Sequence, residues 1–210
     1  MTRAIPFLLL VAAGAGYGAA VVDGIVATVG KAVITDSMVR RSIRTAALLA
    51  RAPLEETPEN WERNRERLIE QALVKEEIRL SRYPVAQPDE IRGAMRQVQE
   101  QMGGPAAFGV QLVAYRLTEA EVAENVAWQI TFARFITYRF RPSVQVTDAA
   151  LRAFYQQWKP AGVKPPFEDV RDLVETEFIA EESARQLDRW LKEVRQQTRI
   201  ETLQPREAKP

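Results

Sequence analysis

The sequence predicts a mainly α-helical protein: an irregular multi-helix module with a small N-terminal β-ribbon and a long C-terminal helix that packs back on it. Two observations indicate this class. Helix-start residues repeatedly precede stretches with apolar side chains at helical spacing. One pair of β-branched runs flanks the dipeptide Gly30-Lys31, as in a hairpin. The 210 residues are 46% hydrophobic and 27% charged, which is an ordinary globular balance.

The first twenty residues have the composition of a secretory leader. The single cation Arg3 precedes an apolar run at 5–13 and small residues at 14–20, with no acidic residue. This pattern predicts a signal peptide cut after Ala20. Pro6 and three glycines interrupt the run, so a retained membrane anchor is the weaker alternative. We expect an exported protein of the periplasm or an equivalent compartment, without stable membrane insertion after cleavage.

The ribbon follows directly as two short strands joined at Gly30-Lys31. A two-stranded ribbon is marginally stable alone and needs another element to pack on. If the last helix packs back on the preceding helices, the two chain ends meet. The short strand expected at 200–203 can then pair with the ribbon.

The first three predicted helices cover about 36–50, 59–82 and 88–102. Polar residues at 35–37 can cap the first helix, and Pro58 and Pro88 suit the opening turns of the other two. Pro84 and Gly103 end the second and third helices. An apolar segment at 108–117 follows, without an assigned conformation.

The remaining elements begin with a capping box formed by Thr118 and Glu121, which predicts a helix to about Arg139. That helix is apolar on nearly all sides, so it is either central in a bundle or presents one face to a partner.

The segment 144–146 can be extended, and Thr147 can cap a short helix to about Trp158. The proline-rich connector 159–166 cannot be helical. The amphipathic helix predicted over 167–198 is too long to be stable alone and must pack on the other helices.

Composition excludes several classes of chemistry. The chain has no cysteine and no histidine, so it cannot build a Cys/His zinc site, a disulfide, a thiol nucleophile or a triad with a histidine base. Loss of Arg3 with the leader leaves 28 of the 29 basic side chains against 28 acidic ones. Such a balance gives no overall field for nucleic acid or anionic lipid. We expect no metal, no cofactor and no nucleic-acid partner.

Two groups of residues have catalytic alternatives. Ser37 near Lys31 suggests a Ser-Lys nucleophile pair, but the serine lies where a helix cap belongs. Glu119, Glu121 and Glu124 suggest a hydrolytic acid pair, but the same spacing suits a capping box and a solvated helix face. We favour the structural interpretation of both groups, and no enzymatic activity is expected.

Segments at both ends of the chain resemble one known family. Residues 22–37 (VDGIVATVGKAVITDS) and 68–74 (LIEQALV) are similar to the N-terminal chaperone module of SurA-like periplasmic proteins. Residues 166–173 (PFEDVRDL) and 187–195 (LDRWLKEVR) are similar to the helix that follows the parvulin domain in SurA, PrsA and their relatives. The resemblance covers nearly the whole mature chain with short motifs.

The sequence departs from this family where the parvulin prolyl isomerase domain normally lies. Only the connector 156–166 occupies that place, and the paired histidines of parvulin sites are absent. The resemblance therefore implies a signal peptide at 1–20 and one chaperone domain at 21–210, without an isomerase. Its parts are the ribbon and helices at 21–146, the short helix and connector at 147–166, and the last helix and tail strand at 167–203.

The implied function is an ATP-independent periplasmic holdase that binds unfolded outer-membrane or envelope polypeptides in an apolar groove. Aromatic and methionine side chains provide adaptable contacts that do not demand one client sequence. The candidate client-binding residues are Met95, Met102, Phe108, Trp128, Phe132, Phe135 and Tyr138. The alternative for each of these residues is that it belongs to the bundle core.

Two other functions stay open. One is a dimeric assembly subunit of the cell envelope, whose groove is filled by a partner or by a second copy of the chain. The weaker one is a surviving isomerase with unusual residues. The sequence leaves the client and the oligomeric state undetermined.

Overall fold

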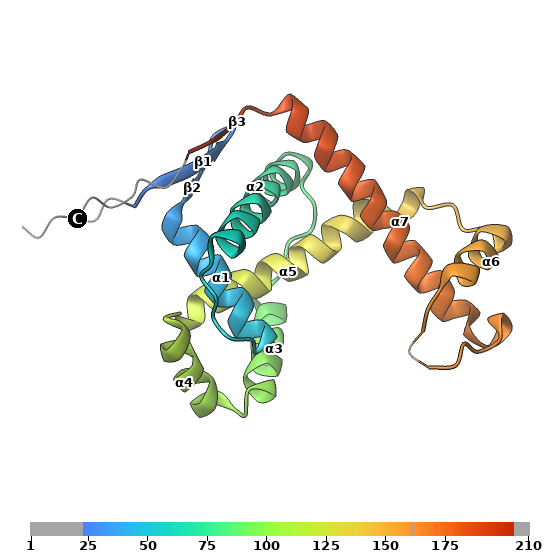
Figure 1. Ribbon diagram of the computed structural model, residues 1–210, viewed down its shortest axis with the longest axis horizontal. Coiled ribbons are helices and arrows are strands. Elements are labelled where there is room, and N and C mark those ends of the chain that lie inside the picture. The colour runs from blue at the N-terminus through green and yellow to red at the C-terminus, as the bar shows by residue number, and fades with distance from the viewer. Residues whose placement is uncertain (1–22, 161, 204–210) are drawn as a thin grey trace, which may run out of the picture.

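The computed structural model describes residues 23–160 and 162–203, and it has the predicted class, mainly helical with a small sheet and a long C-terminal helix (Figure 1). The expected signal peptide at 1–20 lies outside the described residues. The elements in chain order are β1 (Ile25–Val29), β2 (Ala32–Thr35), α1 (Asp36–Ala50), α2 (Pro58–Ser81), α3 (Pro88–Gln101), α4 (Pro105–Tyr115), α5 (Glu119–Arg139), the 3-10 turn η1 (Arg141–Ser143), α6 (Asp148–Gln157), α7 (Phe167–Gln197) and β3 (Ile200–Thr202).

The sheet joins the two ends of the described chain. Its strand order is β2-β1-β3 with antiparallel pairing, and Val29 lies opposite both Ala32 and Ile200. Gly30 takes a φ of 57° in the turn between β1 and β2, which glycine adopts without steric cost. The prediction that the tail strand pairs with the ribbon is therefore confirmed.

Helix starts follow the caps predicted at Thr35, Thr118 and Thr147, and Thr57 caps α2 in the same way. The side chains of Thr35, Thr57, Thr118 and Thr147 each accept a backbone N–H in the first turn of the helix they precede. One element was not predicted: the segment left unassigned at 108–117 lies mostly in α4, which begins with Pro105 in its first turn. Val144 has the expected extended backbone, but it joins no strand of the described sheet.

Buried side chains divide the described fold into two regions. The body comprises the sheet, α1 to α5 and residues 183–197 of α7, with three apolar clusters between these elements. The lobe comprises α6 and residues 167–182 of α7, with a separate small cluster around Leu151, Phe167 and Val174. Figure 1 shows the lobe beside the body, with α7 running through both. No helix within 23–160 and 162–203 combines the length and the apolar character needed to span a membrane.

Candidate functional site

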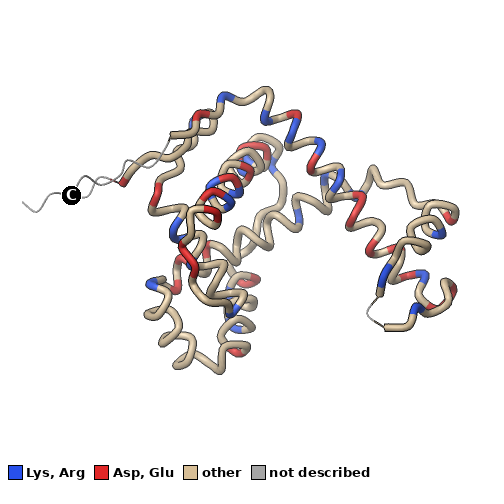
Figure 2. The backbone as a smooth tube through the Cα atoms, in the orientation of Figure 1, with Lys and Arg blue, Asp and Glu red and all other residues tan. Residues whose placement is uncertain are grey.

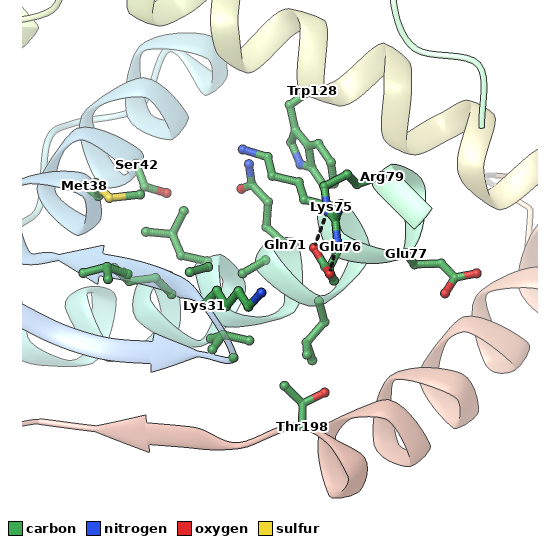
Figure 3. A pocket seen from close by; sticks show the side chains of 18 of the residues that line it. Lys31, Met38, Ser42, Gln71, Lys75, Glu76, Glu77, Arg79, Trp128 and Thr198 are labelled. Atoms are coloured by element: carbon green, nitrogen blue, oxygen red, sulfur yellow. Dashed lines mark hydrogen bonds and ion pairs between the residues drawn. The ribbon is translucent and has the colours of Figure 1, made fainter. Parts of the chain in front are cut away.

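A groove of about 740 Å³ opens in the body between the β-hairpin, α1, α2, α5 and the end of α7 (Figure 3). Its volume falls in the range of known ligand pockets. The groove lies beside the sheet edge that β2 forms, and helix α2 contributes more lining residues than any other element. Sequence segments far apart in the chain therefore build one concave surface.

The apolar part of the groove comes from residues at the edge of the body core. Leu68, Ala72 and Leu73 face it from α2, while Val29 and Ile34 face it from the hairpin. These residues also pack in the cluster between the sheet and α2, so the groove wall is continuous with a close-packed core. The packed core therefore fixes the positions of the apolar side chains that form this wall.

The charged groups of the groove are partly paired. Arg79 donates from Nε and Nη2 to the two carboxylate oxygens of Glu76 at 2.8 and 2.6 Å, and these bonds hold the pKa of Glu76 below its usual value. Arg41 Nη1 lies 3.6 Å from a carboxylate oxygen of Glu121 at the α5 side. Lys75 extends toward the face of Trp128, with its Nζ 5.4 Å from the ring centroid.

Two lysines in the groove are not paired with a carboxylate among the described residues, unlike Arg41 and Arg79. Among the described residues, neither Lys31 nor Lys75 has a carboxylate oxygen within 4.0 Å of its ammonium nitrogen. Lys31 stands at the hairpin turn, and Lys75 stands on α2 (Figure 3). The groove thus holds two cations available to an anionic group.

Of the aromatic residues proposed on α5, Trp128 alone lines the groove. Phe132 stacks on it at a centroid distance of 5.4 Å. Phe135 is 0% exposed and packs against Phe140 and Trp190, so its side chain is core. Tyr138 is 61% exposed outside the groove. The four residues do not form one surface, because α7 covers Phe135 while Tyr138 is exposed outside the groove.

The three other candidate residues lie in a different cluster. Met95 and Phe108 are buried between α3, α4 and α5, and Met102 packs against the same cluster. None of the three lines the groove. These three residues therefore do not form one binding surface with Trp128. The side chains of Met95 and Phe108 are buried, so they offer no surface to a client in this conformation.

The catalytic alternatives have structural roles. Ser37 donates its hydroxyl to the Asp23 carboxylate, and its N–H donates to Asp23 Oδ1 at 3.0 Å. These hydrogen bonds hold the pKa of Asp23 below its usual value, and they tie the start of α1 to the preceding segment. Glu121 accepts the N–H of Thr118 at 2.8 Å, which completes the predicted capping box. In the part of the chain that the structure describes, no group of acidic residues is arranged to hold a metal.

The sequence does not indicate that the hairpin and α2 form the main walls of the groove. Val33 and Lys75 line it, yet neither lies in a motif with a chemical signature. The sequence offers no signal for this, because Val33 and Ile34 are both β-branched and apolar although only Ile34 is buried, and the sequence alone does not tell which strand lies at the sheet edge.

Comparison with models of known protein families finds no match, and comparison with curated proteins finds none either. The resemblance to SurA-like proteins stays a prediction. Function has to be inferred from the groove itself.

Proposed function

We propose that the chain is an ATP-independent holdase that binds unfolded polypeptides in the groove of the body and keeps them from aggregating. The clients in this proposal are outer-membrane or other envelope proteins, and the compartment is the periplasm. The proposal includes no isomerase activity and no covalent chemistry. The observation that carries it is the groove of about 740 Å³, built on the apolar edge of the core.

The side chains around the groove suit a binder of many sequences. Met38 and the stems of Arg41 and Lys75 line it, and flexible or unbranched side chains adapt to different partners. Trp128 is half-buried and adds a large apolar side chain to the lining. Apolar contact is non-directional, so such a surface favours apolar segments without demanding one sequence.

The test is light scattering during dilution of an unfolded outer-membrane barrel protein, with and without residues 21–210 of the chain. Trp128→Ala removes the largest apolar side chain of the groove, and we expect about tenfold weaker suppression, as for an interface hot spot. Tyr138→Ala is the matched control, because Tyr138 is an exposed aromatic residue on the same helix outside the groove. Circular dichroism confirms that both variants remain folded.

Two results contradict the proposal. If the parent chain does not suppress scattering at equimolar concentration, it is not a holdase for this client. If Tyr138→Ala weakens suppression as much as Trp128→Ala, the client surface is not the groove.

One observation favours the alternative of an assembly subunit. Helix α4 carries no charged residue, which Figure 2 shows as an uninterrupted tan segment. It exposes Val110 and Val113, at 68% and 79%, on neighbouring turns. An exposed apolar helix face of this kind is typical of a surface that contacts another protein. Light scattering with chromatography measures the mass of the parent and of Val113→Lys: a dimer that the variant converts to a monomer supports the alternative.

A further inference from the structure

Strand β2 lies at an edge of the sheet and on the groove. In the described sheet it pairs with β1 alone, because β3 occupies the other side of β1. An edge strand presents backbone N–H and C=O groups that a further strand can pair with. Three of the four residues of β2 line the groove: Ala32, Val33 and Ile34.

The pairing register of the described sheet shows which residue of β2 has a free backbone N–H and C=O at this edge. Gly30 N–H donates to the Arg199 carbonyl, and Leu203 N–H donates to the Val26 carbonyl, both at 2.9 Å. The even-numbered residues of β1 therefore direct their backbone groups toward β3. Because the direction alternates along an antiparallel strand, the odd-numbered residues of β1 face β2.

Val33 is consequently the residue whose backbone faces outward. The odd-numbered residues Ala27 and Val29 lie opposite Ile34 and Ala32, so those two residues of β2 direct their groups toward β1. Val33, between them, directs its N–H and C=O away from the sheet. Val33 lines the groove, and its side chain is 46% exposed. This donor and acceptor suit an extended polypeptide backbone.

The charges beside this edge favour an acidic group in the occupant. Lys31 is two residues from Val33, and Lys75 faces the same groove from α2. Glu76 on α2 lines the same groove and interacts with Lys31, but its carboxylate is held by Arg79. Two lysines without a carboxylate within 4.0 Å among the described residues therefore complement a negative charge.

We propose that the groove receives its client as an added β-strand alongside β2, hydrogen-bonded to the backbone of Val33, with an acidic side chain of that strand near Lys31 and Lys75. This inference rests on the proposed holdase function and specifies what the holdase recognises. The preferred segment is extended, apolar at alternate positions, and acidic at one position. Proline at the position that pairs with Val33 is expected to weaken binding of the segment, because proline lacks the backbone N–H.

A peptide pair tests the backbone contact directly. The first probe is a fluorescein-labelled peptide of alternating valine and threonine with one central glutamate. The second has the same sequence with N-methyl groups on alternate backbone nitrogens. Fluorescence anisotropy with the mature chain is expected to show about tenfold weaker binding of the methylated peptide, because the methyl groups remove the N–H that donates to the Val33 carbonyl and block close approach of the strand. Replacing the glutamate by lysine is expected to weaken binding and to reverse its salt dependence, because salt screens the repulsion from Lys31 and Lys75.

Substitutions at Val33 test the protein side of the same contact. Val33→Pro removes the outward N–H, and an edge strand tolerates proline where the N–H is outside the ladder. Val33→Thr retains both the N–H and the side-chain shape. We expect Val33→Pro to bind the glutamate peptide about tenfold more weakly, and Val33→Thr to bind it like the parent.

Hydrogen exchange supplies a measurement that needs no variant. The Val33 amide is expected to exchange more slowly when the glutamate peptide is added to the parent chain. If the peptide binds but leaves this amide unprotected, or if the methylated peptide binds equally well, strand addition is wrong while the holdase proposal stands. If no peptide binds and no aggregation is suppressed, both proposals fail. Protection that grows with protein concentration in the absence of peptide overturns client addition in favour of pairing between two copies of β2.

Discussion

The body and the lobe share helix α7 but are stabilised on very different scales. At the body end, Trp190 packs against Phe135 and Phe140, in a cluster that also includes residues of α2. At the lobe end, α7 meets only α6 and the adjoining connector, with Leu151 and Val174 as fully buried residues. A two-helix unit buries little apolar surface. From this difference we infer that the two ends of one continuous helix belong to units that unfold separately.

This division bears on function because the groove belongs to the body. The groove is lined by Val194 and Gln197 of α7, near its C-terminal end, and by no residue of the lobe. Regions with few buried contacts open locally at low free-energy cost. We therefore expect the lobe to open while the groove stays intact, and three substitutions test this difference.

The largest effect is expected from Phe135→Ala in the body. Phe135 has 0% exposure and contacts aromatic rings from three other segments, so its truncation leaves a cavity that the packed helices cannot close. The free energy of unfolding should fall by roughly 3–5 kcal/mol. Urea unfolding followed by circular dichroism measures it, with Tyr138→Ala as the exposed control on the same helix, expected within about 0.5 kcal/mol of the parent. A loss confined to the lobe would contradict the division.

The next effect is expected from Leu151→Ala in the lobe. Leu151 is fully buried between α6 and α7, and its truncation should cost roughly 2–5 kcal/mol of local stability. Hydrogen exchange should show faster exchange in α6 and in the first part of α7, with unchanged protection in α2 and α5. Peptide binding by the groove should be retained. If protection in α2 falls equally, the body and the lobe unfold together.

The local structure of this chain was largely predictable because its caps act within a few residues. Thr118 and Glu121 specify the start of α5 through bonds that the four-residue motif itself contains. Pairing of β3 with the ribbon was also predicted, since a long last helix has to return the chain end to the helices. In contrast, α4 lacks charged residues and a clear amphipathic pattern, so its helical state was not assigned.

The candidate site was less predictable because burial on α5 depends on elements distant in sequence. Trp128 and Phe135 lie seven residues apart, about two turns, and so share a helix face. Phe135 is nevertheless core and Trp128 lines the groove, because Trp190 of α7 covers α5 at Phe135. The position at which α7 crosses α5 is set by tertiary packing and not by the local sequence of α5. For the same reason, the sequence did not show that the edge of β2 lies on the groove.

The smallest effect is expected from Glu121→Gln, at the start of α5 in the body. Its carboxylate accepts the backbone N–H of Thr118 and lies near Arg41. The bond from the Thr118 N–H is the main cause that lowers the pKa of Glu121 below its ordinary value of 4.5, with smaller contributions from the Thr118 hydroxyl and Arg41 against burial. Because the folded pKa is depressed, the charge stabilises the body above about pH 4.5, and this contribution is lost as the pH falls through the folded value.

Glutamine keeps an acceptor oxygen for the capping box but carries no charge, so Glu121→Gln isolates the electrostatic part. Urea unfolding across the acid range should show the variant less stable than the parent by under about 1 kcal/mol near neutral pH, and equal to it at low pH. Glu168→Gln is the matched control, because Glu168 lies in the first turn of α7 in the lobe and pairs with Arg152 at the surface. An equal loss of stability of the body in that variant would mean that the lobe and the body unfold together, which would remove the distinction between them.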